Sequence, residues 1–240
     1  MCVLVKTTEN ELLENIQNFL DDLEVVTEQN NVEYILKTKN GSYIYNEFSL
    51  QHELGIYLRQ IYSIEGYKIE FERNSKKFFD KTKTKHEIDI VIYNGEKKLA
   101  AIELKFPRNG QYPESMYSFV KDIRFLEELS FEEKEGFQSG ILLTIVDDCK
   151  FYNSETGKRK LTCDGIYKYF RINDQDKENT LWVNGKVDKP TGNKKSVGNE
   201  DLLPCIELIG KYQINWKKLN KDEYNSPIKY FLINAKKQST

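Results

Sequence analysis

The sequence is poor in the residues that build covalent or histidine-based sites. Its 240 residues include only 4 cysteines, none in a C-x-x-C pair, and only two histidines, His52 and His86. A chain of this length does not depend on disulfides for its core, and structural zinc sites need closely spaced cysteines and histidines. A disulfide scaffold, a structural zinc domain and a Ser-His-Asp hydrolase are therefore disfavoured. Carboxylates and lysines remain as the groups expected to carry chemistry.

Long apolar runs are also missing. No stretch approaches the roughly 18 apolar residues that a membrane span needs. The first residues, MCVLVKTTENELLENI, become acidic before a signal-peptide core can form. With 39% hydrophobic residues, 31% charged residues and 5 prolines, the composition is that of a polar globular protein. We expect one large domain with additions, no membrane partner and a cytoplasmic location.

Charge is nearly balanced overall but unevenly distributed. The formal net charge is -2, although residues 1–72 hold 5 basic against 13 acidic side chains. Residues 73–85, RNSKKFFDKTKTK, hold six basic side chains and one acidic one. Such a run forms either a solvated loop or a contact for phosphates. The candidates for nucleic-acid binding in this run are Arg73, Lys76, Lys77, Lys81, Lys83 and Lys85.

The hydrophobic pattern predicts an α/β protein in three parts. Residues 1–48 form an N-terminal elaboration, with a helix over 9–28 and a hairpin that turns at Asn40-Gly41. Residues 49–148 form the core, whose elements are a helix (49–64), three strands (67–73, 86–93 and 97–106), a helix (113–130) and a strand (140–148). Residues 149–240 form a strand-rich extension packed on the core, with strands expected at 165–171, 180–183, 203–210 and 227–234.

Three charged side chains interrupt two otherwise apolar strands. Asp89 lies in EIDIVIY, and Glu103 and Lys105 lie in LAAIELKF. Burying a charge is costly unless it is paired or bound to a metal. Residues i and i+2 of a strand point to the same face, so Glu103 and Lys105 are neighbours. If Asp89 joins them, two carboxylates and an ammonium group meet at a place that suits a hard divalent cation.

The register between these strands tests that idea. A two-residue turn at Asn94-Gly95 would put Asp89 and Glu103 on opposite faces of the sheet. An odd loop, or a β-bulge that restores the parity, would put them on the same face. The sequence therefore predicts one of these two irregularities. Under the alternative interpretation, both acids are edge or solvent-face residues that pair with Lys105 or Lys85 across the sheet.

The arrangement resembles the PD-(D/E)xK nuclease superfamily over about residues 49–146. The match is an acid on one strand, E-x-K on the next, a preceding helix that carries glutamate and a following helix, with Ile88 where the family has proline. The resemblance implies a restriction-endonuclease-like mixed central sheet flanked by helices. It implies Mg²⁺ (or Mn²⁺) binding by Asp89, Glu103 and the main-chain carbonyl of Leu104, and it matches Lys105 to the catalytic lysine. Glu53 is the candidate for the helix glutamate.

The resemblance implies a metal-dependent nuclease, with DNA as the expected substrate and a restriction, repair or defence role. A homodimer would suit cleavage of both strands. Tyr117, Lys121 and Arg124, on the helix after E-x-K, are expected to share a face turned away from the core, where they would hold backbone phosphates or only water. Two alternatives remain: a catalytically inactive nucleic-acid-binding or assembly module on the same fold, and a protein-interaction domain without a nucleic-acid role.

Overall fold

The computed structural model describes residues 9–27, 33–79, 85, 87–95, 97–108, 110–131, 136–156, 159–172, 180–190 and 205–236. Within these ranges the α-helices are α1 (Glu9–Asp21), α2 (Glu47–Tyr62) and α3 (Tyr112–Phe131). The first helix is shorter than the sequence predicted. A strand, β1 (Glu24–Thr27), follows it, because Val25, Val26 and Thr27 are β-branched and favour extended backbone.

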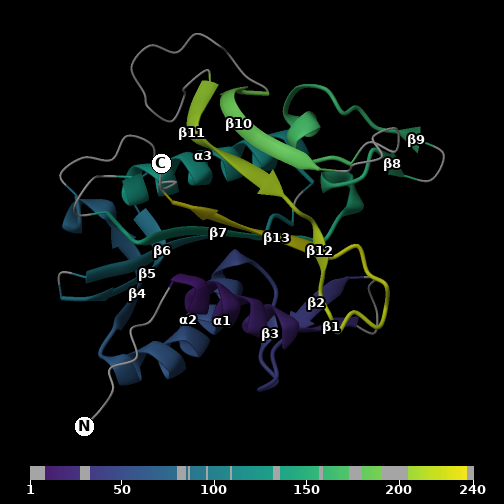
Figure 1. Cartoon of the computed structure of the whole chain (residues 1–240). Coiled ribbons are helices and arrows are strands. Elements are labelled where there is room, and N and C mark those ends of the chain that lie inside the picture. The colour runs from purple at the N-terminus through teal and green to yellow at the C-terminus, as the bar shows by residue number, and fades with distance from the viewer. Residues whose placement is uncertain are drawn as a thin grey trace.

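A mixed six-stranded sheet forms the centre of the molecule (Figure 1). Its order is β12-β13-β7-β6-β5-β4, and only the β6–β7 pair is parallel. The parallel pair is joined by α3, as a crossover between parallel strands requires. The strands are β4 (Lys68–Asn74), β5 (Glu87–Asn94), β6 (Lys97–Lys105), β7 (Ser139–Val146), β12 (Lys217–Lys218) and β13 (Lys229–Ala235).

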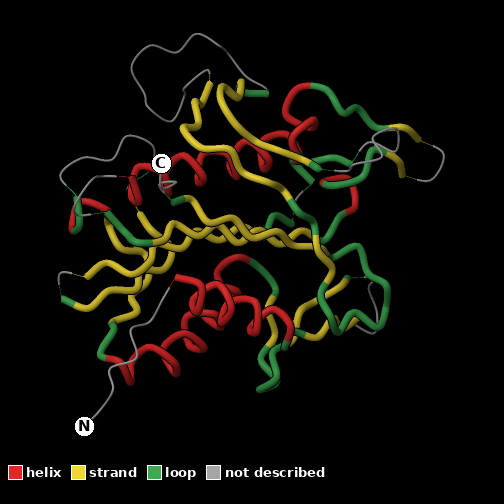
Figure 2. The backbone as a smooth tube through the Cα atoms, in the orientation of Figure 1, coloured by secondary structure: helices red, strands yellow, loops and turns green. Residues whose placement is uncertain are grey.

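Helices cover both faces of this sheet (Figures 1 and 2). On one face lie α1, α2 and a small sheet of β1, β2 (Tyr34–Lys37) and β3 (Tyr43–Ile44), whose last two strands form the predicted hairpin. The α2 helix fits closely because the Phe71 ring packs where a Cβ at Gly55 would stand. On the other face lies α3, so the sheet is buried between two hydrophobic clusters.

A two-stranded ribbon covers the outer side of α3. It consists of β10 (Leu181–Asp188) and β11 (Cys205–Ile214), which pair antiparallel with a bulge after Asn184. Figure 1 shows the ribbon, α3, the central sheet and the α1–α2 layer stacked in that order. The strand expected at 165–171 is wrong, because Gly165–Tyr169 forms the 3₁₀ helix η4.

The remaining elements of the described ranges are short. They are the 3₁₀ helices η1 (Ser63–Glu65), η2 (Ser75–Lys77) and η3 (Cys149–Phe151) and the strands β8 (Glu155–Thr156) and β9 (Arg159–Lys160). None of the helices placed by the structure has the length and apolar character needed to cross a membrane.

The register between β5 and β6 contains the predicted irregularity. Asn94 pairs with Lys97, which leaves a two-residue turn, and the register then shifts between Ile92 and Tyr93. Beyond this bulge, Ile90 pairs with Ile102. A bulge therefore restores the parity, as the sequence required, and Asp89 and Glu103 reach the same face of the sheet.

Candidate functional site

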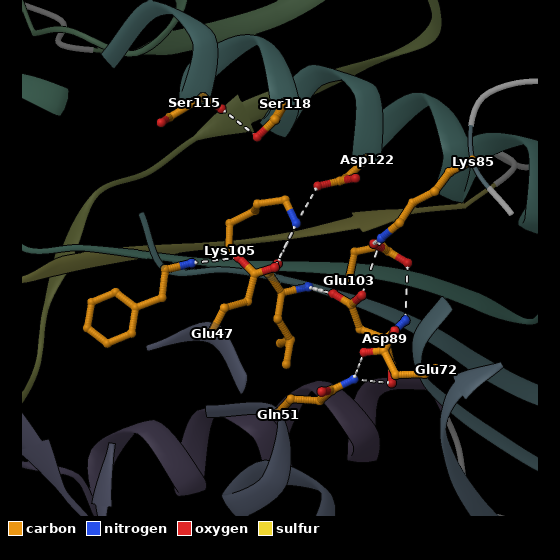
Figure 3. A network of polar contacts seen from close by, with 12 residues as sticks. Glu47, Gln51, Glu72, Lys85, Asp89, Glu103, Lys105, Ser115, Ser118 and Asp122 are labelled. Atoms are coloured by element: carbon orange, nitrogen blue, oxygen red, sulfur yellow. Dashed lines mark hydrogen bonds and ion pairs between the residues drawn. The ribbon is translucent and has the colours of Figure 1, made fainter. Parts of the chain in front are cut away.

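Asp89 and Glu103 lie together on the face of the sheet that α3 covers (Figure 3). Glu103 is 0% exposed and Asp89 is 7% exposed. The Leu104 backbone N–H donates to Asp89 Oδ2 at 2.8 Å, and the Asp89 backbone N–H lies 3.4 Å from Glu103 Oε1. Backbone donors from both strands thus fix the two carboxylates side by side. Both acids are buried, so the alternative interpretation is wrong in placing them on a solvent-facing surface of the sheet.

The Lys85 ammonium group lies between these two carboxylates. Its Nζ atom is 3.2 Å from Asp89 Oδ1 and 2.5 Å from Glu103 Oε2. The alternative interpretation anticipated a pairing with Lys85, and this feature of it is present. The sequence analysis had otherwise placed Lys85 among the candidates for binding nucleic acid. In this structure its ammonium group is instead directed into the carboxylate pair.

Lys105 lies beside Glu103 but has different partners. Its ammonium group donates to the Leu104 carbonyl at 2.8 Å and to Glu47 Oε1 at 3.2 Å, and it lies 3.2 Å from Asp122 Oδ2. These acceptors come from β6 and from the helices on the two sides of the sheet. Lys105 is therefore held from three directions, at the end of β6 where Glu103 also lies (Figure 3).

Glu47 is brought to the site by the way α2 begins. Asn46 caps the helix by accepting from the Ser49 backbone N–H at 3.0 Å, and the Ser49 hydroxyl oxygen accepts from the Asn46 N–H at 3.0 Å. The sequence analysis had begun this helix at Ser49. The capping box makes it begin two residues earlier, at Glu47. Glu47 then occupies the first turn and also accepts from the Phe106 backbone N–H at 3.2 Å.

Glu53, the expected helix glutamate, lies elsewhere. It lies six positions after Glu47, which is about 1.7 turns of helix, so the two side chains leave α2 in different directions. Glu53 instead pairs with His52 at 3.3 Å and lines a cavity of about 170 Å³ between α1, α2 and the β2–β3 turn. The glutamate that α2 supplies to the Lys105 cluster is therefore Glu47 and not Glu53.

Asp122 of α3 is a buried site residue that the sequence analysis missed. It is 5% exposed and reaches Lys105 from the helix layer. Phe119, Ile123 and Leu126 are buried core residues of α3, and position 122 lies three residues after the first and four before the last of these. A charge at that spacing is the same anomaly that identified Asp89, and it would have identified Asp122.

Gln51 connects α2 to the acidic strand. Its Nε2 atom donates to the Asp89 carbonyl at 2.7 Å and to Glu72 Oε1 at 2.6 Å. Glu72 has a φ of 47°, a left-handed conformation that is uncommon outside glycine. This residue lies between Phe71 and Arg73, which pair with the two neighbours of Asp89. The backbone on both sides of Asp89 is therefore held in place.

The cluster carries an excess of negative charge. Its four carboxylates are Glu47, Asp89, Glu103 and Asp122, and its two ammonium groups are Lys85 and Lys105, which leaves a formal charge of -2 when all are ionised. Burial and the neighbouring Asp89 charge raise the pKa of Glu103 well above its ordinary value. Burial alone would lower the pKa of Lys105, but the carboxylates, Asp122 first, outweigh it and raise that pKa.

The remaining basic candidates have separate surroundings. Arg73 Nε and Lys77 Nζ both pair with Glu70, at 2.8 and 3.1 Å, on the edge strand β4. The Lys76 side chain is exposed. Lys81 and Lys83 lie outside the described residues. The basic run is therefore not one uniform surface where the structure describes it.

The candidates on α3 need a correction. Tyr117 is 6% exposed and belongs to the hydrophobic core, and Arg124 pairs with Glu127 and Glu128 at 3.2 and 3.5 Å. The expectation of one solvated face failed because the ribbon of β10 and β11 covers the side of α3 opposite the sheet. Lys121 remains partly exposed.

The donor set fits a hard divalent cation at the Asp89–Glu103 pair. Carboxylate oxygens from two strands already converge on one cation, the Lys85 ammonium group. Mg²⁺ commonly binds through one or two carboxylates and completes its shell with water and phosphate oxygens. Among the residues that the structure describes, no group of three or more His, Cys, Asp or Glu side chains is arranged to hold a metal.

Comparisons of the chain with protein-family models, with curated proteins and with solved structures found no match. The case for a function therefore depends on the geometry of this site and on the motif that led to it.

Proposed function

We propose that this protein has a restriction-endonuclease-like fold and hydrolyses phosphodiester bonds in nucleic acid, with DNA as the substrate, in a metal-dependent reaction. One observation carries the proposal. Oxygens of Asp89 and Glu103, from neighbouring strands, converge on one cation position, and Lys105 lies next to Glu103 on the same face. The order of elements around this site, a helix, three strands, a helix and a strand, also supports it.

Asp89 and Glu103 would hold Mg²⁺ or Mn²⁺. The Leu104 carbonyl, the third ligand that the resemblance implies, accepts from Lys105 at 2.8 Å in this structure, so it could join them only if that hydrogen bond changed. When bound, such a cation lowers the pKa of a coordinated water and neutralises charge on the phosphate. Lys105 stays protonated because its pKa is raised, so it acts as a hydrogen-bond donor and positive charge and not as a base. Glu47 and Asp122 orient its ammonium group toward the end of β6, where an attacking water and the phosphate would lie.

The charge of the cluster explains why a cation would be needed. A site with a formal charge of -2 repels a phosphodiester, which is itself an anion. A divalent cation would neutralise the cluster and attract the substrate. The basic run would add a salt-sensitive contact to the nucleic-acid backbone through exposed lysines such as Lys76. Cleavage of both strands of a duplex would need two copies of the site, which a homodimer would provide.

One observation favours a second candidate function, a catalytically inactive nucleic-acid-binding or assembly module. Lys85 already neutralises part of the acidic pair, and Lys105 has three acceptors around it. These ion pairs hold both lysines in the cluster without a metal. Such a module would retain DNA equally well in EDTA and would not cut it.

The test is cleavage of supercoiled plasmid in Mg²⁺ or Mn²⁺, with EDTA as the metal-free control. We expect Glu103→Gln and Lys105→Ala each to lower the cleavage rate by about 100-fold or more, the cost of removing one group that stabilises charge in a transition state. Two matched variants on α2 test the geometry. Glu47→Gln should lower the rate, and Glu53→Gln should leave it unchanged.

Two results would contradict the proposal. If all variants cut like the wild type, the activity does not come from this site. If no metal supports cleavage while the protein still retains DNA in EDTA, the binding module is the correct function.

A further inference from the structure

Lys85 and Lys105 contact the same acidic cluster, but they differ in how far each is exposed and in how many elements surround it. The Lys105 side chain is 15% exposed and is surrounded by acceptors from β6, α2 and α3. The Lys85 side chain is 31% exposed and approaches the acids from the segment that precedes β5. One lysine is therefore enclosed within the fold, and the other covers the Asp89–Glu103 pair from its solvent side.

The Lys85 ammonium group and a divalent cation would use the same oxygens. Asp89 Oδ1 and Glu103 Oε2 lie 3.2 and 2.5 Å from Lys85 Nζ. A Mg²⁺ ion needs its oxygens at about 2.0–2.1 Å, and it strongly repels a nearby ammonium group. Both cations cannot occupy this position together, so metal binding requires Lys85 to leave.

Lys85 is able to leave without disrupting the fold. Its long flexible side chain reaches a pair that remains fixed by backbone donors, because the Leu104 and Asp89 N–H groups hold the carboxylates independently of the lysine. Its partial exposure gives the ammonium group a route to water or to a phosphate. The Glu103 carboxylate, in contrast, cannot move away, and it needs a cation beside it whenever it is ionised.

We propose that Lys85 is the built-in counter-cation of this site, which neutralises Asp89 and Glu103 in the metal-free protein and is displaced when a divalent cation binds. This inference rests on the proposed function. Lys85 thereby weakens metal binding and sets the concentration of metal at which the site fills. Once displaced, its ammonium group would contact the phosphate of a bound substrate.

The test measures Mn²⁺ binding to the full-length protein by titration calorimetry, without substrate. The variants are Lys85→Gln, Asp89→Asn and the matched control Lys76→Gln, which removes the same charge from the same basic run at an exposed position. We expect Lys85→Gln to tighten Mn²⁺ binding about tenfold or more, equivalent to about 1.4 kcal/mol. Lys76→Gln should change the affinity much less, and Asp89→Asn should abolish binding at the site.

A second measurement uses the wild type and does not depend on how the variant folds. Lysines are acetylated at increasing Mn²⁺ concentrations, and the labelling of each is followed by mass spectrometry. Lys85 should become more reactive as Mn²⁺ fills the site, whereas Lys76 should not change.

The outcomes separate this inference from the proposed function. Mn²⁺ binding that needs Asp89 but is indifferent to Lys85→Gln, or that leaves Lys85 labelling unchanged, overturns the role of Lys85 alone. Absence of Mn²⁺ binding in both the wild type and Lys85→Gln removes the proposed function, and the role of Lys85 with it.

Discussion

Two fully buried glutamates lie on opposite sides of α3, and their partners differ in kind. Glu103 faces the helix from the central sheet, and Glu127 projects from the helix toward the ribbon of β10 and β11. Both are 0% exposed. A buried carboxylate must be satisfied by nearby donors or charges, so the nature of those partners indicates what each glutamate does.

Glu127 is held by three donors of β11, in addition to its ion pair with Arg124 at 3.2 Å. It accepts from the backbone N–H groups of Ile209 and Gly210, at 3.0 and 2.7 Å, and from the Tyr212 hydroxyl at 2.9 Å. Gly210 is needed there because a Cβ would collide with the Tyr212 side chain. These donors cannot leave without moving β11. The carboxylate therefore fastens the ribbon to α3.

Glu103 has partners that can change. Its closest charged neighbours are the like charge of Asp89 and the partly exposed ammonium group of Lys85. Like charges at close range destabilise each other unless a cation lies between them. Glu127 therefore has mostly donors of β11 around it, whereas Glu103 lies beside a like charge and a partly exposed ammonium group. Under the proposed function, the first carboxylate is structural and the second takes part in cation binding.

The largest expected effect on stability comes from removing Glu127, the glutamate that contacts the ribbon. Glu127→Ala leaves the buried Tyr212 hydroxyl and the part-buried N–H groups of Ile209 and Gly210 without this acceptor, and it removes one partner of Arg124. We expect a loss of about 3–5 kcal/mol in the free energy of unfolding, measured by equilibrium urea denaturation. The ribbon should loosen first, which faster hydrogen exchange at Ile209 and Gly210 would detect.

The matched control is Glu128→Ala, the next residue on the same helix, which pairs with Arg124 at 3.5 Å. Removal of that ion pair should cost less than about 1 kcal/mol. Equal losses in the two variants would mean that the contacts of Glu127 with β11 do not fasten the ribbon.

The sequence was sufficient to predict the centre of this fold and part of its site. Apolar strands interrupted by single charges identified Asp89, Glu103 and Lys105, because a charge in a buried strand needs a partner. The parity of strand residues then required a bulge or an odd loop, and the bulge near Ile92 confirmed that requirement. These predictions used only local periodicity.

The rest of the site depends on contacts that local patterns do not contain. The start of α2 was fixed by the Asn46 cap, and that start decides that Glu47 reaches the strands and Glu53 does not. Tyr117 was expected on an open face, but β11, far along the chain, covers that face. The position of Lys85, two residues before β5, is not set by a strand or helix periodicity.

The next expected effect concerns Glu103 and the way in which the stability of the protein depends on pH. The pKa of Glu103 is raised above its ordinary 4.5, so the folded chain keeps a proton that the unfolded chain releases. Between these two pKa values the folded state binds more protons, and stability therefore falls as pH rises. In EDTA, we expect the wild type to lose up to about 1.4 kcal/mol per pH unit relative to Glu103→Gln in this window, which begins near pH 4.5.

The measurement is urea denaturation of both proteins at a series of pH values from 4.5 upward. The amide of Glu103→Gln does not titrate, so the difference between the two curves isolates the Glu103 carboxyl group. Parallel curves would show that Glu103 has the same proton affinity in both states, and that the two lysines offset the effects of burial and of Asp89.

The smallest expected effect on stability comes from removing one hydrogen-bond donor to Glu127. Tyr212→Phe removes one donor from Glu127 and leaves the Ile209 and Gly210 N–H groups in place. Burial and the charge of Glu127 raise the pKa of Tyr212, so its hydroxyl remains a donor at neutral pH. We expect a loss of about 1–1.5 kcal/mol in the free energy of unfolding, more than for Tyr152→Phe, whose hydroxyl donates to the neutral Pro227 carbonyl.

Mn²⁺ affinity and plasmid cleavage should stay at wild-type values in both variants, because neither hydroxyl contacts the Asp89–Glu103 pair. A change in Mn²⁺ affinity on Tyr212→Phe would show that the two sides of α3 are coupled, and the separation of a structural from a binding carboxylate would no longer hold.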